Sequence, residues 1–224
     1  MSATIILAKN LTAGTIQHIN DVDRGKEIYF TCVGCGKEMI AVKSVARKRD
    51  WHYRHKIESD CAGARDTALH DYAVQTLMDS KRIFIRRNFC IEYSNPRKEV
   101  SVLGKRSDVT VSYNSSELHF EVFVTHDLDS EKIALYQLNK ILCVKIDLSY
   151  LINIPASPIE IRNAVLENHL NKKIIFWLPS TINPVSKTQN PILKVIVVIL
   201  GVLASIFFIK YLLGRRNNHT IKER

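Results

Sequence analysis

Hydrophobic and polar positions alternate in short runs along the first three quarters of the chain. The runs Thr4–Ala8 and Glu27–Thr31 predict two short strands. Apolar residues recur at helical spacing in Asp66–Ser80, which predicts a helix there. Period-2 alternation then predicts three further strands, at Arg82–Tyr93, Val100–Tyr113 and Leu118–Thr125.

Capping patterns mark two more helices. Asp129 precedes a helical pattern that continues to about Lys140, and the run Ile141–Leu148 after it resembles a buried strand. The sequence Ser157-Pro158-Ile159-Glu160 has the spacing of a capping box with proline at the first helical position, so it predicts a helix to about Leu170. The order helix, three strands, helix, strand indicates an α/β (α+β) domain. Its hairpin is expected to be antiparallel, with one strand returned by a crossover helix.

An apolar run near the C-terminal end predicts a transmembrane helix at Ile192–Leu213. The run is about as long as the ~20 residues that cross a bilayer core, and its lysines, Lys194 and Lys210, lie near the ends. The alternative is a buried core helix, which would normally carry a polar stripe that this run lacks. Residues 179–191 then form a polar linker, and residues 214–224 form a basic tail.

The start of the chain lacks the pattern of a secretory signal, so we expect the domain before the linker to face the cytoplasm. The protein is then a single-pass protein of the cell membrane. The basic tail conflicts with this orientation, because an excess of lysine and arginine usually stays on the cytoplasmic side.

The net charge of the whole chain is +10, and the part before the apolar segment, without Lys194, carries 26 basic and 21 acidic residues, or +5. This smaller charge does not by itself indicate a nucleic-acid partner. The charge is concentrated in one short stretch. This stretch is either a solvated loop or a surface that contacts DNA phosphates. Its basic residues are Lys43, Arg47, Lys48, Arg49, Arg54 and Lys56.

Cysteine and histidine spacing predicts a structural zinc site. Cys32 and Cys35 have the Cys-x-x-Cys spacing of a tetrahedral site, and Cys61 with His52 or His55 would complete four ligands. His52 and His55 point to opposite faces of an extended segment, so one of them is expected to bind, and His55 is preferred. A redox-active cysteine pair is the alternative. The remaining cysteines, Cys90 and Cys143, lie in apolar runs typical of core residues.

Two acidic residues are expected to face each other across a hairpin. Asp108 and Glu121 both lie on the polar face of their strands, and a turn at Asn114–Ser116 places them opposite each other, with side-chain roots about 5 Å apart. Such carboxylates repel unless a cation lies between them, and Mg²⁺ or Mn²⁺ suits their oxygen atoms. The alternative is that both acids simply face solvent.

These motifs together resemble the competence protein CoiA-like family. The resemblance rests on Cys32-x-x-Cys35, His52-Tyr-Arg-His55, Cys61, the helix that begins Asp66-Thr-Ala-Leu-His70, and the strands that carry Asp108 and Glu121. It spans about Ala3 to Trp177. It implies a zinc-binding head at residues 1–65 and a PD-(D/E)XK restriction-endonuclease-like core at residues 66–178.

The chain departs from the family pattern at the lysine that would orient the attacking water. Phe123 occupies that position, and Lys132, in the first turn of the next predicted helix, is a candidate substitute. The alternative for Lys132 is an exposed helix charge. Asp66 and His70 share one helix face, so they either support the metal site or belong to a buried polar network.

The expected function is therefore a membrane-anchored nuclease that acts on DNA with Mg²⁺ or Mn²⁺ held by Asp108 and Glu121. Two other functions stay open. One is a catalytically inactive nucleic-acid-binding module, which Phe123 favours. The other is a membrane adaptor that binds protein through its zinc head.

Overall fold

The computed structural model describes residues 4–23, 28–44, 50–59, 61 and 63–178. Contacts divide the chain into two compact units, residues 1–182 and 183–224, and the second unit lies outside the described residues. The predicted linker, transmembrane helix and basic tail lie outside them as well. Within the described ranges, no helix combines the length and apolar character needed to cross a bilayer.

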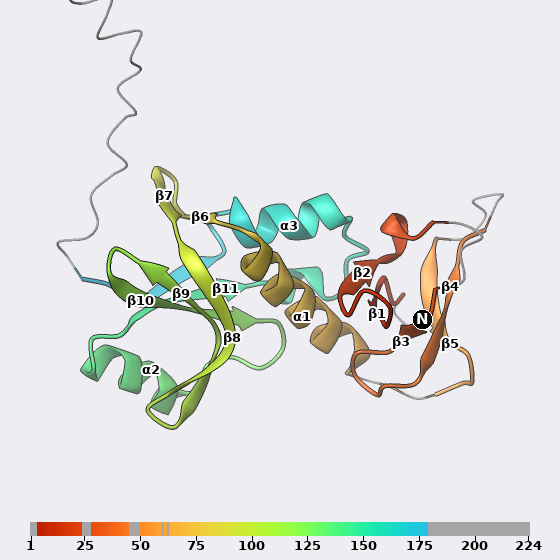
Figure 1. Cartoon of the computed structure of the whole chain (residues 1–224), viewed down its shortest axis with the longest axis horizontal. Helices are drawn as coiled ribbons and strands as arrows, with labels where there is room; N and C mark the ends of the chain where they lie inside the picture. The colour runs from red at the N-terminus through yellow and green to blue at the C-terminus, as the bar shows by residue number, and fades with distance from the viewer. Residues whose placement is uncertain (1–3, 24–27, 45–49, 60, 62, 179–224) are drawn as a thin grey trace, which may run out of the picture. The chain divides into compact units, whose positions relative to one another are not determined.

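The N-terminal part is an antiparallel sheet with the strand order β2-β1-β3-β4-β5 (Figure 1). Its own small core contains Phe30, Met39 and Tyr53, and a short 3₁₀ helix, η1, follows β2. The two strands predicted here overlap β1, which lies further toward the C-terminus, and β3, which covers only the last two residues of the prediction. The elements are β1 (Leu7–Asn10), β2 (Ile16–His18), η1 (Ile19–Asp21), β3 (Phe30–Thr31), β4 (Glu38–Val42) and β5 (His52–His55).

The second part is a mixed sheet with the order β12-β11-β10-β9-β8. β10 and β11 are parallel and are joined through helix α2, so the predicted crossover is confirmed, and the fold is mixed α/β. A separate hairpin, β6–β7, lies beside this sheet. The elements are α1 (Ala64–Asp79), β6 (Arg82–Arg86), β7 (Phe89–Glu92), β8 (Ser94–Val102), β9 (Lys105–Tyr113), β10 (Ser116–Phe123), α2 (Ser130–Leu138), β11 (Leu142–Asp147), η2 (Ser149–Leu151), α3 (Pro158–Leu166) and β12 (Lys172–Phe176).

Three sequence-based element predictions were wrong in their extent. The strand predicted at Arg82–Tyr93 is the hairpin β6–β7, which turns between Arg86 and Phe89. The strand predicted at Val100–Tyr113 is interrupted by a turn at Leu103–Gly104, where both residues have positive φ. The helix from Ser157 ends at Leu166, and β12 was not predicted. In the first two cases, the residues on both sides of a tight turn have strand-like patterns, so nothing in the sequence pattern indicates that the chain reverses direction there.

The helix starts follow the predicted caps. The Asp129 carboxylate accepts a hydrogen bond from the Lys132 backbone N–H, which begins α2. At α3, the Ser157 hydroxyl accepts from the Glu160 N–H while the Glu160 carboxylate accepts from the Ser157 N–H, and Pro158 opens the helix. These reciprocal bonds satisfy two helix N–H groups that have no partner within the helix.

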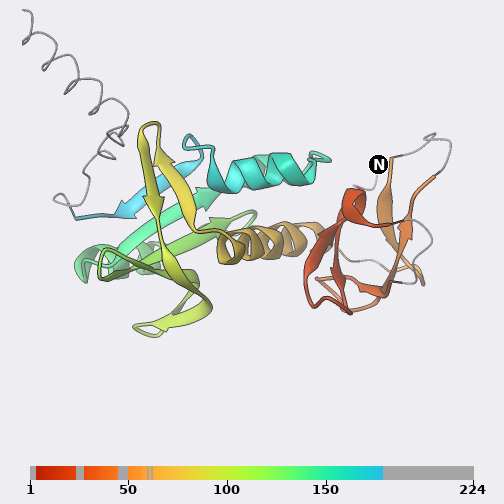
Figure 2. The same cartoon turned by 45° about the horizontal axis from the view of Figure 1, so that its top comes forward.

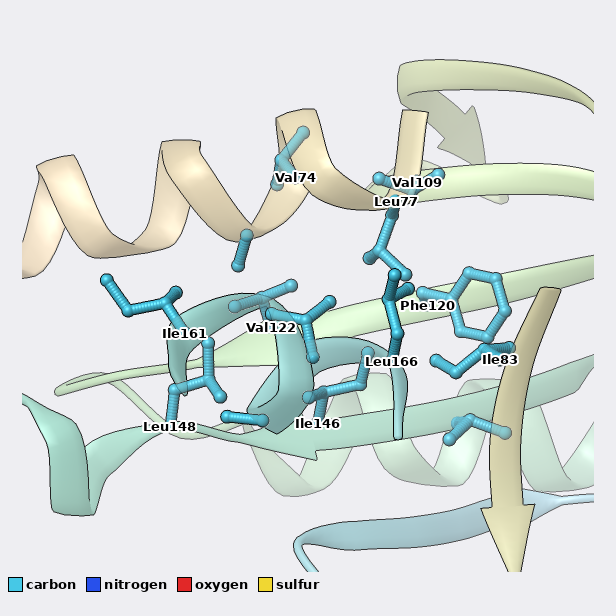
Figure 3. Close-up of a cluster of buried hydrophobic side chains, with 14 of the residues drawn as sticks. Val74, Leu77, Ile83, Val109, Phe120, Val122, Ile146, Leu148, Ile161 and Leu166 are labelled. Carbon is cyan, nitrogen blue, oxygen red and sulfur yellow. The ribbon is translucent and has the colours of Figure 1, made fainter. Parts of the chain in front are cut away.

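The main core lies between one face of the mixed sheet and helices α1 and α3 (Figure 3). Alternate residues of β10 and β11 point into it, so their neighbours in sequence point to the other face, which α2 covers. Glu121 lies between the core residues Phe120 and Val122, and it therefore faces α2. The core residues labelled in Figure 3 are Val74, Leu77, Ile83, Val109, Phe120, Val122, Ile146, Leu148, Ile161 and Leu166.

Truncation of a buried α1 residue should destabilise this core. Leu77 is fully buried, so Leu77→Ala is expected to lower the free energy of unfolding by about 2–5 kcal/mol through lost burial and a cavity. Leu138 is 81% exposed, so Leu138→Ala is the matched control, with an expected change within about 0.5 kcal/mol. Urea unfolding of the full chain in detergent measures both. Equal losses would contradict this description of the core.

Candidate metal centre and carboxylate pocket

Four predicted ligands come together at one point of the N-terminal part. The ligand atoms of Cys32, Cys35, His55 and Cys61 all lie within 4.8 Å of one another. Cys35 Sγ is 3.3 Å from His55 Nε2, and Cys32 Sγ is 3.7 Å from Cys61 Sγ. Three thiols and one imidazole form a donor set typical of a structural zinc site. This group can therefore hold a structural metal such as zinc.

A tight turn between β3 and β4 positions the first two cysteines. The Cys32 carbonyl accepts from the Gly36 N–H, and the Cys32 N–H donates to the Lys37 carbonyl, both at 2.8 Å. A Cβ atom on Gly34 would lie 3.0 Å from the Ala64 Cα and 3.3 Å from Cys61 Sγ. The turn therefore packs directly on the first residue of α1, and only glycine allows this approach.

Electrostatics of the thiols favour a bound cation. The backbone N–H of Lys37 lowers the pKa of Cys35 to about 7, so this thiol ionises readily. Burial, with the neighbouring Cys32 and Cys35, raises the pKa of Cys61 to about 12. Without a metal, Cys35 therefore ionises readily and Cys61 does not. A divalent metal would favour the thiolate form of both, because it stabilises several thiolates at once.

The other candidate ligands lie outside the cluster. The His52 Nδ1 lies 2.9 Å from the Asp50 carbonyl, whereas His55 faces the cysteines, as the strand alternation predicts. Cys90 and Cys143 are not part of the cluster, and all five cysteines are free. Cys143 is fully buried under α2, in keeping with the predicted core role.

A second candidate site is an open pocket of about 430 Å³ beside the C-terminal end of β10. Asp66 and His70 of α1, Asp108 of β9, Glu121 of β10 and Lys132 of α2 all line it. The five residues come from four elements, and they are the ones singled out in the sequence for catalysis and support.

The β9–β10 hairpin carries the two carboxylates just beyond its last paired residues. Asn114 and Ser115 both have positive φ, which is typical of a two-residue hairpin turn. The register follows as predicted, from Ser116 opposite Tyr113 to Phe120 opposite Val109. At the end of this ladder the Asp108 carboxylate accepts a hydrogen bond from the Val122 N–H at 2.7 Å.

Glu121 is a buried carboxylate with two strong partners from α2. Its side chain is 3% exposed, Lys132 Nζ lies 2.6 Å from Oε2, and the Tyr136 hydroxyl donates to Oε1. Burial, with a contribution from Asp108, raises the pKa of Glu121, while Lys132 and Tyr136 act in the opposite direction. Lys132 is 15% exposed and also donates to the Arg106 carbonyl, so the reading of Lys132 as an exposed helix charge was wrong.

Sequence reasoning missed two residues of this network. Tyr136 is fully buried, and the His119 ring stacks on it with centroids 5.9 Å apart. His119 Nδ1 lies 2.9 Å from the Thr110 hydroxyl, so this ring nitrogen also has a partner. The available signal was the spacing of Lys132 and Tyr136, one helical turn apart on the face that covers Glu121.

Helix α1 contributes the supporting residues. His70 Nε2 lies 3.2 Å from Asp108 Oδ2. Burial lowers the pKa of His70, but Asp108 and Asp71 outweigh it and raise the pKa to about 9. The Thr125 hydroxyl donates to Asp66 Oδ2 at 3.0 Å, whereas the buried Oδ1 of Asp66 has no hydrogen-bond partner among the described residues. Asp66 therefore lines the pocket with one oxygen bound to Thr125 and the other buried.

Phe123 lies at the position where the sequence comparison with the motif expected a lysine, and another lysine lies close to it. Lys145 Nζ is 4.8 Å from the Phe123 ring centroid and 2.8 Å from Asp127 Oδ1. Lys145 lies opposite Glu121 in the parallel β10–β11 ladder. It is held by Asp127, however, whereas Lys132 contacts Glu121 directly.

The structure describes part of the basic stretch from Lys43 to Lys56, near the cysteine-histidine cluster. Lys43 Nζ lies 4.1 Å from the Trp51 ring centroid and donates to the Val22 carbonyl, and Lys56 pairs with Glu38 at 2.9 Å. Arg54 is exposed on β5. The other three predicted DNA-contacting residues, Arg47, Lys48 and Arg49, lie outside the described residues.

Comparisons of the chain with protein-family models, curated proteins and solved structures find no match. The chemical interpretation of both sites therefore depends on the geometry given above. The strongest elements of that geometry are the four converging metal ligands and the buried Glu121 beside Lys132.

Metal analysis tests the cysteine-histidine site. The full chain, purified under reducing conditions, is expected to carry about one zinc ion, as four-ligand structural sites do. Cys35→Ser should lose the ion and unfold the N-terminal sheet, because such metals contribute folding energy. Cys90→Ser, a cysteine outside the cluster, should retain it. Wild-type protein without any zinc would contradict the assignment.

Removal of the lysine partner should leave Glu121 unpaired. Lys132→Met is expected to cost about 3–5 kcal/mol in the free energy of unfolding near neutral pH. Burial already raises the pKa of Glu121 above its unfolded value, so the folded state binds a proton more tightly. The penalty is complete above the folded pKa, and it should shrink as the pH falls toward about 4.3. Lys81→Met, at an exposed lysine, is the control. A loss independent of pH would contradict the role assigned to Lys132.

Proposed function

We propose that the protein is a membrane-anchored, metal-dependent nuclease that acts on DNA. The observation that carries this proposal is the contact of Lys132 with the buried Glu121, beside Asp108, in an open pocket. The order and spacing of the motifs, which resemble the CoiA-like family, also support it. We further propose that the mixed sheet and its crossover helix form a PD-(D/E)XK-like core.

The two carboxylates would hold the catalytic ion. A bound Mg²⁺ or Mn²⁺ ion activates water and neutralises charge on a scissile phosphate. Asp108 is oriented for this task by the Val122 N–H and by His70. Glu121 is oriented by Tyr136 and Lys132, so an ion bound at Glu121 competes with the lysine for the same carboxylate.

Lys132 is proposed to replace the lysine that Phe123 displaces. Its ammonium group reaches the pocket from α2 rather than from the strand that carries Glu121. Once it leaves Glu121, the same group can orient a water molecule or contact a phosphate oxygen. Because it then acts at the reacting atoms, its loss should affect the rate more than DNA affinity.

The N-terminal part is proposed to have a structural role and a DNA-binding role. Zinc at Cys32, Cys35, His55 and Cys61 would hold the β3–β4 turn on the start of α1. Arg54, exposed on β5, and the basic residues around it would contact the phosphate backbone. The apolar segment Ile192–Leu213 would anchor the chain in the cell membrane, with the nuclease-like domain facing the cytoplasm.

A catalytically inactive DNA-binding module is the second candidate function. Phe123 favours it, and so does the hydrogen bonding of Glu121, whose two oxygens already have partners from α2. In this case the pocket would have no catalytic role, and Lys132 would only neutralise the buried carboxylate of Glu121.

A cleavage assay separates these functions. The full chain in detergent is expected to cleave single- or double-stranded DNA with Mg²⁺ or Mn²⁺. Asp108→Asn and Glu121→Gln should each reduce the rate about 100-fold or more, the usual scale for a lost transition-state charge contact. Lys132→Ala should lower the rate with little change in DNA affinity. Glu92→Gln, an exposed acid outside the pocket, should leave the rate unchanged.

Two results would overturn the nuclease assignment. If wild-type protein binds DNA in a salt-sensitive manner but cleaves none with either ion, the protein is the inactive module. If it binds no DNA at all, a membrane adaptor that binds protein through the zinc head takes its place.

A further inference from the structure

An exposed basic surface lies where the described chain ends. Arg86 and Arg87 form the tip of the β6–β7 hairpin, and both are exposed. Within the described part of the chain, neither arginine forms an ion pair. Lys140, exposed in the turn before β11, lies at the same end of the mixed sheet. We call these three residues the exit surface.

Aromatic contacts fix the hairpin beside the end of the last strand. The rings of Phe89 and Trp177 pack edge to face with centroids 5.6 Å apart, and the Tyr113 ring centroid lies 5.5 Å from that of Trp177. Phe89 follows the hairpin tip, and Trp177 follows β12 directly. Lys140 lies three residues before Cys143, which pairs with Phe176 of β12, so it lies at the end of the sheet where the described chain ends.

The sequence after Leu178 limits how far this end of the sheet can lie from the apolar segment. Even when fully extended, the chain between Leu178 and Ile192 spans at most about 45 Å. If Ile192–Leu213 is in a membrane, the exit surface is therefore held within reach of the lipid headgroups. Exposed arginines near a membrane surface are attracted to anionic lipids and not to neutral ones.

We propose that Arg86, Arg87 and Lys140 contact anionic phospholipid headgroups of the membrane that anchors the chain. This inference rests on the membrane anchoring in the proposed function. The nearby acids lie at other positions: Glu167 pairs with Arg82 at the base of the hairpin, Glu92 lies opposite Arg82 in the β6–β7 ladder, and Glu117 is bound to Arg97.

The contact would set the orientation of the domain. The exit surface lies at the N-terminal ends of β10 and β11, and the carboxylate pocket lies beyond the C-terminal end of β10. The eight residues of β10 separate these ends by roughly 25 Å. A headgroup contact at one end of β10 would therefore leave the pocket, at the other end, free of that contact.

Hydrogen exchange of the full chain in lipid nanodiscs tests the contact. One set of nanodiscs contains phosphatidylcholine alone, and the other contains phosphatidylcholine with phosphatidylglycerol. The backbone amides from Arg86 to Phe89 are expected to exchange more slowly in the anionic discs. Two headgroup contacts of ordinary strength correspond to at most about 30-fold protection. Arg86→Gln/Arg87→Gln should remove this difference while the chain stays inserted.

A charge-matched control separates contact from net charge. Arg54→Gln/Lys56→Gln removes two charges from the N-terminal sheet and should leave the protection of the hairpin unchanged. Equal exchange in both lipids, with the chain inserted, would overturn the headgroup contact alone. A chain that does not insert would overturn the anchoring and this inference together. If the hairpin variant instead weakens binding to an oligonucleotide while protection persists, the surface binds nucleic acid and the inference fails.

Discussion

The packing of helix α1 between the two sheets is the constraint on which the rest of the structure depends (Figure 2). Its small residues Ala68 and Ala73 are fully buried and let the helix lie close to its neighbours. The helix begins next to Cys61 and under the Gly34 turn, so the cysteine-histidine cluster determines where its first turn lies. One turn later, His70 reaches Asp108. The start of α1 is therefore positioned by the cysteine-histidine cluster, and the same helix positions His70 next to Asp108 on the mixed sheet.

The buried acid on β10 shows how the fold tolerates a costly group. A carboxylate taken out of water is unfavourable unless it is paired and hydrogen-bonded. Glu121 meets both conditions through one helix, because Lys132 and Tyr136 lie one turn apart on α2. A buried ion pair of this kind contributes little net stability, and its effect is to fix the position of α2 on the sheet. The geometry of the pocket and the docking of the helix are therefore the same interaction.

Much of the fold and of the candidate sites could be predicted from the sequence, and some of it could not. The caps at Asp129 and Ser157 and the hairpin register around Asn114 depend on local chemistry, so they were predictable. The spacing predicted a site of Cys32, Cys35, Cys61 and one of two histidines, and the structure brings His55 to the cysteines. The turn in the β6–β7 hairpin was not, because its residues resemble the strands beside it. Tyr136 was missed for a different reason: its spacing from Lys132 puts both on one helix face, but the spacing does not say that this face covers Glu121.

The crossover helix α2 also has a consequence for the evolution of the carboxylate pocket. The loop from Thr125 to Leu128 lines the pocket and supplies few core residues, so substitutions there can alter the pocket at little cost to folding. Helix α2 is different, because the same few residues cover the sheet and hold Glu121. A substitution in α2 therefore changes stability and chemistry together. New specificity should arise first in the loop, while the helix stays as it is.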